Sequence, residues 1–101
     1  MNTTGELRAA GGARYALAGE VTLATVTALR ERGLRAFGAD REPIEVNLAE
    51  VQRADSGALA LLVDWLAWAR AAGRELRYTA LPAPLLALAR LSDVEDLLTG
   101  R

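Results

Sequence analysis

The sequence predicts a small α/β domain, with a mixed β-sheet of about four strands and helices packed on it. Strand-like and helix-like segments alternate along the chain, and strand–helix–strand steps favour right-handed crossovers between neighbouring strands. Of the 101 residues, 51% are hydrophobic, which is enough for one compact core. No internal repeat or long linker divides the chain, so residues 1–101 are expected to form a single domain.

The first part of the chain predicts a hairpin followed by a helix. Glu6–Ala10 and Ala13–Ala18 are short strand candidates, separated by a Gly-Gly dipeptide that suits a tight turn. Thr22 is expected to cap the helix that follows. The apolar residues of this helix recur with imperfect helical spacing: Leu23, Val26, Leu29, Leu34 and Phe37.

A strand and a long helix come next. Ile44–Leu48 alternates apolar and polar residues, which predicts a strand, and Ala49–Ala54 is expected to link it to the helix. Either Asp55 or Ser56 is the expected N-cap, because both residue types accept hydrogen bonds from the free N–H groups at a helix start. Gly73 ends the helix where a C′ glycine is common.

The end of the chain predicts a further strand and two helical segments. Arg74–Thr79 is the strand candidate. A leucine-rich helix then begins at Pro82 or Pro84, since proline is favoured at the first helical position. Ser92 and Asp93 are expected to cap a final helical turn.

The long helix, Ser56–Ala72, is apolar on more than one side. Its expected core stripe consists of Leu59, Leu62, Val63, Leu66 and Ala69. A second apolar face carries Leu61, Trp65, Trp68 and Ala72. Helices of two-layer domains are usually covered on one side only, so Trp65 and Trp68 are predicted to point outward to a partner. The alternative is that another element of the same chain covers them.

Composition argues against several functions. The formal net charge of −1 offers no electrostatic reason to bind nucleic acid or an anionic membrane surface. The chain has no Cys and no His, and therefore lacks disulfides, thiolate metal sites and the commonest general base. The N-terminus does not have the pattern of a signal peptide, and the longest apolar run is too short for a membrane span. We therefore expect a cytoplasmic protein that does not insert into the membrane.

No motif indicates catalysis, a metal site or a cofactor. The Gly-Gly dipeptide is not followed by the Lys-Ser/Thr of a phosphate loop. Asp93, Glu95 and Asp96 are expected to be a cap and a solvated helix start. Asp55 and Ser56 are adjacent, and adjacent side chains rarely point at one another as a catalytic pair requires. The protein is predicted not to be an enzyme.

At Asp55 and Ser56 the sequence resembles the STAS-domain family. Its pattern is a strand, a short loop, Asp followed by Ser or Thr, a small residue and a leucine-rich helix, and Ile44–Leu48 and the following residues match this order. The resemblance covers nearly the whole chain. Residues 51–62 and 81–91 look most like MlaB, the STAS subunit of the Mla phospholipid-transporting ABC complex of Gram-negative bacteria.

The resemblance implies a non-catalytic cytoplasmic subunit of a transporter that maintains outer-membrane lipid asymmetry. Such a subunit binds the ATPase subunit, and through it the permease, at the inner membrane. The predicted partner-binding residues are Asp55, Ser56, Gly57, Ala60, Leu61, Asp64, Trp65 and Trp68. The sequence leaves open whether the free protein forms a homodimer through its tryptophans.

Two departures from the family pattern concern Ser56 and its neighbours. Gly57 and Ala58 stand in exchanged order relative to the usual small residue and glycine. The phosphorylated serine of anti-sigma factor antagonists corresponds to Gly57, which has no hydroxyl. We therefore interpret Ser56 as a capping and contact residue. The alternative is an anti-sigma factor antagonist in which Ser56 is the phosphoacceptor.

Overall fold

The computed structural model describes residues 4–38 and 41–100. After an initial pair of strands, helices and strands alternate until two helices end the series, as predicted. Their order is β1 (Glu6–Ala9), β2 (Arg14–Val21), α1 (Val26–Phe37), β3 (Ile44–Ala54), α2 (Ser56–Ala71), β4 (Leu76–Thr79), α3 (Ala83–Leu91) and α4 (Glu95–Thr99). Among the described residues, none of these helices has the length and apolar character needed to cross a lipid bilayer.

The strands form a four-stranded mixed sheet in the order β1-β2-β3-β4, which confirms the predicted fold class. β1 and β2 are antiparallel and form the hairpin. Gly11 and Gly12 make its turn with φ angles of 103° and 59°, values that favour glycine. β2, β3 and β4 run parallel to one another, and α1 and α2 provide the two crossovers.

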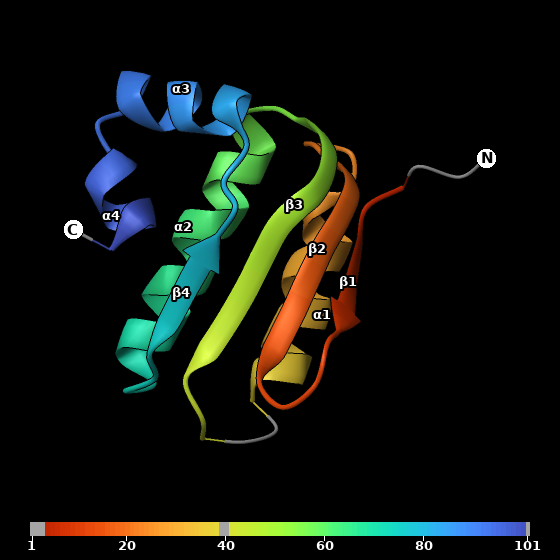
Figure 1. Cartoon of the computed structure of the whole chain (residues 1–101), viewed down its shortest axis with the longest axis vertical. Helices are drawn as coiled ribbons and strands as arrows, with labels where there is room; N and C mark the ends of the chain where they lie inside the picture. Colours follow the sequence, from red (N-terminus) through yellow and green to blue (C-terminus); the bar gives the residue numbers. More distant parts are fainter. Residues whose placement is uncertain (1–3, 39–40, 101) are drawn as a thin grey trace.

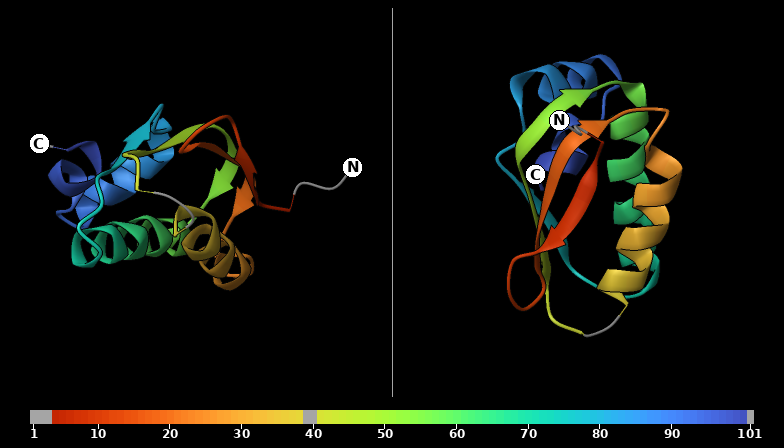
Figure 2. Two further views of the ribbon diagram at one scale, coloured as in Figure 1. Left: turned by 90° about the horizontal axis from the view of Figure 1, so that it is seen from below. Right: turned by 90° about the vertical axis from the view of Figure 1, so that its right-hand side faces the viewer.

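The sheet and its helices form two layers. α1 and α2 lie side by side against one face of the sheet, while α3 and α4 lie at the β4 side of the molecule (Figures 1 and 2). In the part of the chain that the structure describes, no helix covers the face turned away from α1 and α2 (Figure 2). The strands carry the solvent-exposed ion pairs Arg8–Glu50 and Arg77–Glu45. The hydrophobic core therefore lies between one face of the sheet and the two long helices.

Two boundaries differ from the sequence prediction. β3 continues through Ala54 instead of ending at Leu48, because β2 offers partners as far as Val21, which pairs with Ala54. The second half of β3 is mostly half-buried or exposed, so it lacks the alternation that marks the first half. α1 begins at Val26, with Thr25 rather than Thr22 as the N-cap residue.

At the ends of the later helices the predictions are confirmed in part. Asp55 is the N-cap of α2, and Gly73 follows its C-cap with a φ of +68°. Pro82 is the N-cap residue of α3. The predicted cap of the final turn is wrong, since α4 has Val94 at its N-cap, without a side-chain hydrogen bond.

The prediction that Leu61 and Trp65 face outward is wrong. Trp65 is fully buried and Leu61 is 3% exposed, because α1 packs against this side of α2. The indole of Trp65 meets the ring of Phe37 edge-on, with 5.2 Å between centroids, and its Nε1 donates a hydrogen bond to the carbonyl oxygen of Arg30 at 3.3 Å. Gly33 makes this contact possible, because a Cβ at that position would lie 2.5 Å from two carbon atoms of the indole.

Trp68 is half-buried, so the prediction of an outward-facing indole is wrong in part for this residue. Its ring lies 5.9 Å from the ring of Phe37 and 5.9 Å from the guanidinium carbon of Arg74. Val63 and Leu66, both expected in the central core, are also half-buried. The buried side of α2 is thus rotated toward α1 relative to the predicted stripe, because two helices that lie side by side bury each other's flanks.

Candidate functional site at the start of helix α2

One carboxylate joins the start of α2 to the loop between β2 and α1. Oδ1 of Asp55 accepts a hydrogen bond from the backbone N–H of Gly57 at 2.7 Å, which is the N-cap contact of the helix. Oδ2 of the same side chain accepts from the backbone N–H of Leu23 at 3.2 Å. A negative charge at a helix N-terminus is favourable, so Asp55 both stabilises α2 and positions the loop.

Gly57 allows the loop to approach the helix closely. A Cβ at this position would lie 2.7 Å from the backbone nitrogen of Leu23 and 3.0 Å from its Cα. Backbone atoms cannot move aside as the end of a flexible side chain can. The glycine is therefore needed for space between the two segments, and its predicted place in the site has a structural reason.

The loop presents a leucine to solvent. The side chain of Leu23 is 70% exposed, although its backbone is held by Asp55. Thr25 fixes the loop from the other side: its hydroxyl donates to the carbonyl oxygen of Glu20 at 2.9 Å and accepts from the N–H of Thr22 at 3.0 Å. An exposed leucine on such a well-ordered loop is available to a partner at little cost in conformational entropy.

Sequence reasoning did not place Leu23 in the site. The imperfect helical spacing of the apolar residues predicts Leu23 in the stripe of the following helix. Because α1 begins only at Val26, Leu23 lies in a turn instead, and no feature of the sequence alone distinguishes the two positions.

Ser56 is exposed at the first position of α2. Asp55 provides the cap, so the serine hydroxyl is not used for it. Within residues 4–38 and 41–100 the hydroxyl of Ser56 has no hydrogen-bond partner. It is therefore available to a second molecule.

The outer face of α2 continues this surface with small side chains. Ala60, Ala67 and Ala71 are exposed and lie on one side of the helix, since Ala67 is seven residues after Ala60 and four before Ala71. Asp64 borders this face and forms an ion pair with Arg30 of α1. We call Leu23, Ser56, Ala60 and Asp64 the α2-start surface.

The structure thus divides the predicted site residues into two groups. Asp55, Ser56, Gly57, Ala60 and Asp64 lie at or beside the α2-start surface. The remaining members, Leu61, Trp65 and Trp68, lie on the flank of α2 that packs against α1, and of these three only Trp68 is partly accessible.

The geometry of the site is suited to binding and lacks the arrangement of a nucleophile and its base. Both carboxylate oxygens of Asp55 accept hydrogen bonds from backbone N–H groups, and neither contacts the hydroxyl of Ser56. A serine nucleophile needs an adjacent base within hydrogen-bond reach. The surface offers instead a leucine, a hydroxyl and a flat helix face.

Comparison with protein families agrees with this fold. The family model described as "Mlab, STAS domain" matches residues 6–99 of the chain. The chain belongs to the MlaB-type STAS-domain family. A search of curated proteins finds no match. Membership confirms the resemblance seen in the sequence, and the four-stranded mixed sheet with its helices is consistent with a STAS domain.

Proposed function

We propose that this protein is a non-catalytic accessory subunit that binds the ATPase subunit of an ABC-type phospholipid transporter. Its membership of the MlaB-type STAS family supports the class of partner. The observation that carries the proposal is the α2-start surface: Leu23 is exposed while Asp55 holds its backbone at the start of α2, and the exposed Ser56 has a hydroxyl without a hydrogen-bond partner among the described residues. Family membership alone would not say which surface makes the contact.

The α2-start surface has the properties of a binding epitope. Leu23 supplies an apolar side chain that is already held in place, so little freedom is lost on binding. Ala60 has a side chain short enough to let a partner helix approach α2 closely. Ser56 and Asp64 provide polar groups at the edge, as in the polar rim of many interfaces.

In this proposal the protein reaches the membrane only through its partner. The ATPase subunit would hold it on the cytoplasmic side of the inner membrane and connect it to the permease. Its role is to support the assembly and activity of the ATPase in a transporter that maintains outer-membrane lipid asymmetry.

Affinity capture from the source cell tests the proposal. The tagged protein should retain an ABC ATPase subunit together with its permease. Leu23→Lys and Ala60→Arg should each reduce the captured ATPase at least tenfold, about the loss expected when a central contact is replaced by a charge. Both positions are exposed, so the variants should melt like the native protein.

Ala49→Arg is the matched control for Ala60→Arg. Ala49 is equally exposed but lies in β3, on the face of the sheet away from the helices. This variant should capture as much ATPase as the native protein. Equal capture by the Ala60→Arg and Leu23→Lys variants, or the absence of any ABC ATPase among the captured proteins, would refute the proposal.

A second candidate function is favoured by the free hydroxyl of Ser56. An exposed serine at a helix start is accessible to a kinase, as an anti-sigma factor antagonist requires. A phosphate there would gain from the helix N-terminus but would lie beside the carboxylate of Asp55. Phosphorylation in the source cell, mapped to Ser56 by mass spectrometry, together with capture of a kinase in place of an ATPase, would favour this second function.

A further inference from the structure

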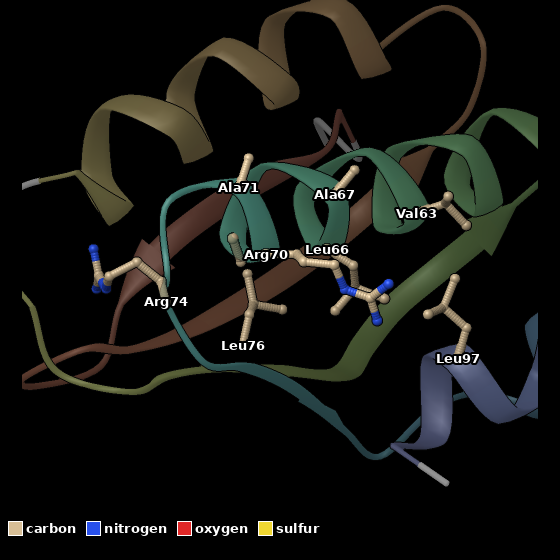
Figure 3. Close-up of a pocket in the computed structure, with 9 residues that line it drawn as sticks. Val63, Leu66, Ala67, Arg70, Ala71, Arg74, Leu76 and Leu97 are labelled. Carbon is tan, nitrogen blue, oxygen red and sulfur yellow. The ribbon is translucent and has the colours of Figure 1, made fainter.

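A groove runs along the side of the molecule away from α1. It lies between α2, β4 and α4 and has a volume of about 590 Å³ (Figure 3). Its apolar wall is formed by Val63 and Leu66 of α2, Leu76 of β4 and Leu97 of α4. Its volume is in the range typical of small-molecule sites, roughly 300–1,000 Å³.

The packing of the helices explains why the core is open here. α1 covers the flank of α2 that carries Leu61 and Trp65, so Val63 and Leu66 are left at the opposite flank. α4 is only five residues long and closes part of this edge, leaving the side chain of Leu97 39% exposed. The groove is therefore separate from the α2-start surface and does not depend on the proposed function.

The charge around the groove is one-sided. Among the described residues, two arginines and no acidic residue line it. Arg74 donates hydrogen bonds to the carbonyl oxygens of Phe37 at 2.6 Å and Glu42 at 2.8 Å, and it lies at one end of the groove (Figure 3). Arg70 is exposed and has no ion pair within the described residues; its guanidinium extends along the groove toward Leu97 (Figure 3).

We propose that this groove binds one molecule of a long-chain fatty acid. The alkyl chain would lie against Leu66, Leu76 and Leu97, and the carboxylate would bind the guanidinium of Arg70. A planar guanidinium is well suited to a carboxylate, because the two groups form paired, charge-assisted hydrogen bonds. The combination of an apolar wall with one available cation matches a ligand that has one long apolar chain and one anionic end.

The charges favour this occupant over a second copy of the chain. A symmetric dimer through the groove would place two copies of the same surface against each other. Arg70 would then face an apolar wall and its own symmetry mate, and the described residues that line the groove include no acid to balance either charge. A fatty acid supplies the missing negative charge.

Titration with dodecanoate, kept below its micelle concentration, tests the proposal on the native protein. The expected result is saturable one-to-one binding, with NMR shifts confined to the methyl groups of the groove. Dodecyltrimethylammonium has the same chain and the opposite charge, so it should bind at least tenfold more weakly. Arg70→Gln should weaken dodecanoate binding roughly tenfold, the effect of losing one charge-assisted contact.

Two further variants make the outcome decisive. Arg32→Gln removes an exposed arginine of α1, outside the groove, and should leave the affinity unchanged. Leu97→Glu alters the partly exposed end of the apolar wall and should weaken binding without changing the melting temperature by more than a few degrees. Capture of the ATPase should be the same for all three variants and the native protein.

Several outcomes would overturn the proposal. One is equal affinity for dodecanoate and dodecyltrimethylammonium. Another is an unchanged dodecanoate affinity in Arg70→Gln, and a third is a set of NMR shifts that lie mainly outside the groove. Sedimentation that shows self-association, abolished by Leu97→Glu, would assign the groove to a second copy and reject the fatty acid.

Discussion

Replacing Gly33 with alanine tests whether close contact between α1 and α2 keeps Trp65 in the interior. Alanine is preferred over glycine in a helix by about 1 kcal/mol, so an exposed position here would make the variant more stable. In this structure the new Cβ would lie 2.5 Å from Cε2 and Cζ2 of Trp65 and 2.7 Å from Nε1. The ring is fully buried, so it has no free space into which to move.

The sign of the stability change in Gly33→Ala follows from these opposing effects. Overpacking a well-packed core costs about 1–3 kcal/mol, and displacing the indole also weakens its hydrogen bond to Arg30. Adding about 1 kcal/mol for the weakened hydrogen bond and subtracting about 1 kcal/mol of helix propensity, we expect Gly33→Ala to lower the free energy of unfolding by about 1–3 kcal/mol. For a domain of this size the melting temperature should fall by roughly 5–20 °C.

Urea denaturation of four proteins measures this effect: the native chain, Gly33→Ala, Trp65→Leu and the double variant. Without the large ring, alanine at position 33 has room and should stabilise the protein by about 1 kcal/mol relative to Trp65→Leu alone. The sign of the Gly33→Ala effect thus reverses between the two backgrounds. An increase in stability from Gly33→Ala in the native background would refute the buried position of Trp65.

Three other predictions concern separate contacts. Burial raises the pKa of Tyr78 well above its usual range, and its hydroxyl donates to the carbonyl oxygen of Leu62 at 2.6 Å. The folded state therefore keeps this proton more tightly than the unfolded chain, whose tyrosine pKa is about 10. Stability should be fully present below about pH 10 and fall as the pH rises further, with a smaller fall in Tyr78→Phe, measured by urea midpoints. Asp55→Ala should cost about 1–2 kcal/mol and speed amide hydrogen exchange at Leu23, because two backbone N–H groups lose their acceptor. Exchange at Leu23 as slow as in the native protein would contradict that role. Arg8→Gln should change stability by less than about 1 kcal/mol in thermal melts, since its ion pair with Glu50 is solvent-exposed.

Local signals in the sequence are sufficient to predict most of the helices and strands. The alternation in Ile44–Leu48 predicts a strand, the Gly-Gly dipeptide predicts a turn, and the Asp-Ser pair predicts a helix start. The structure contains all three. These predictions are correct because each signal depends only on residues that are neighbours along the chain. The second half of β3 was missed, since its strand conformation depends on pairing with β2, which lies some thirty residues earlier in the sequence.

The candidate site could be predicted only in part. Asp55, Ser56 and Gly57 were found because a helix start has a recognisable pattern. The tryptophans were assigned to the wrong environment, because helical periodicity shows that α2 has two apolar faces and does not show what covers each one. Leu23 was not assigned to the site at all, because its exposure depends on the contact between its backbone and Asp55.

The sequence by itself determined the fold class, the order of the elements and the position of the α2 start. These follow from periodicity, turn residues and capping residues, all of which act over a few neighbouring residues. Only the tertiary structure decided that α1 covers Trp65, that Leu23 is exposed while its backbone binds Asp55, and that a groove with Arg70 opens on the other flank of α2. The physical reason is that an apolar helix face can be buried against any neighbour, and the neighbour is chosen by the packing of the whole domain.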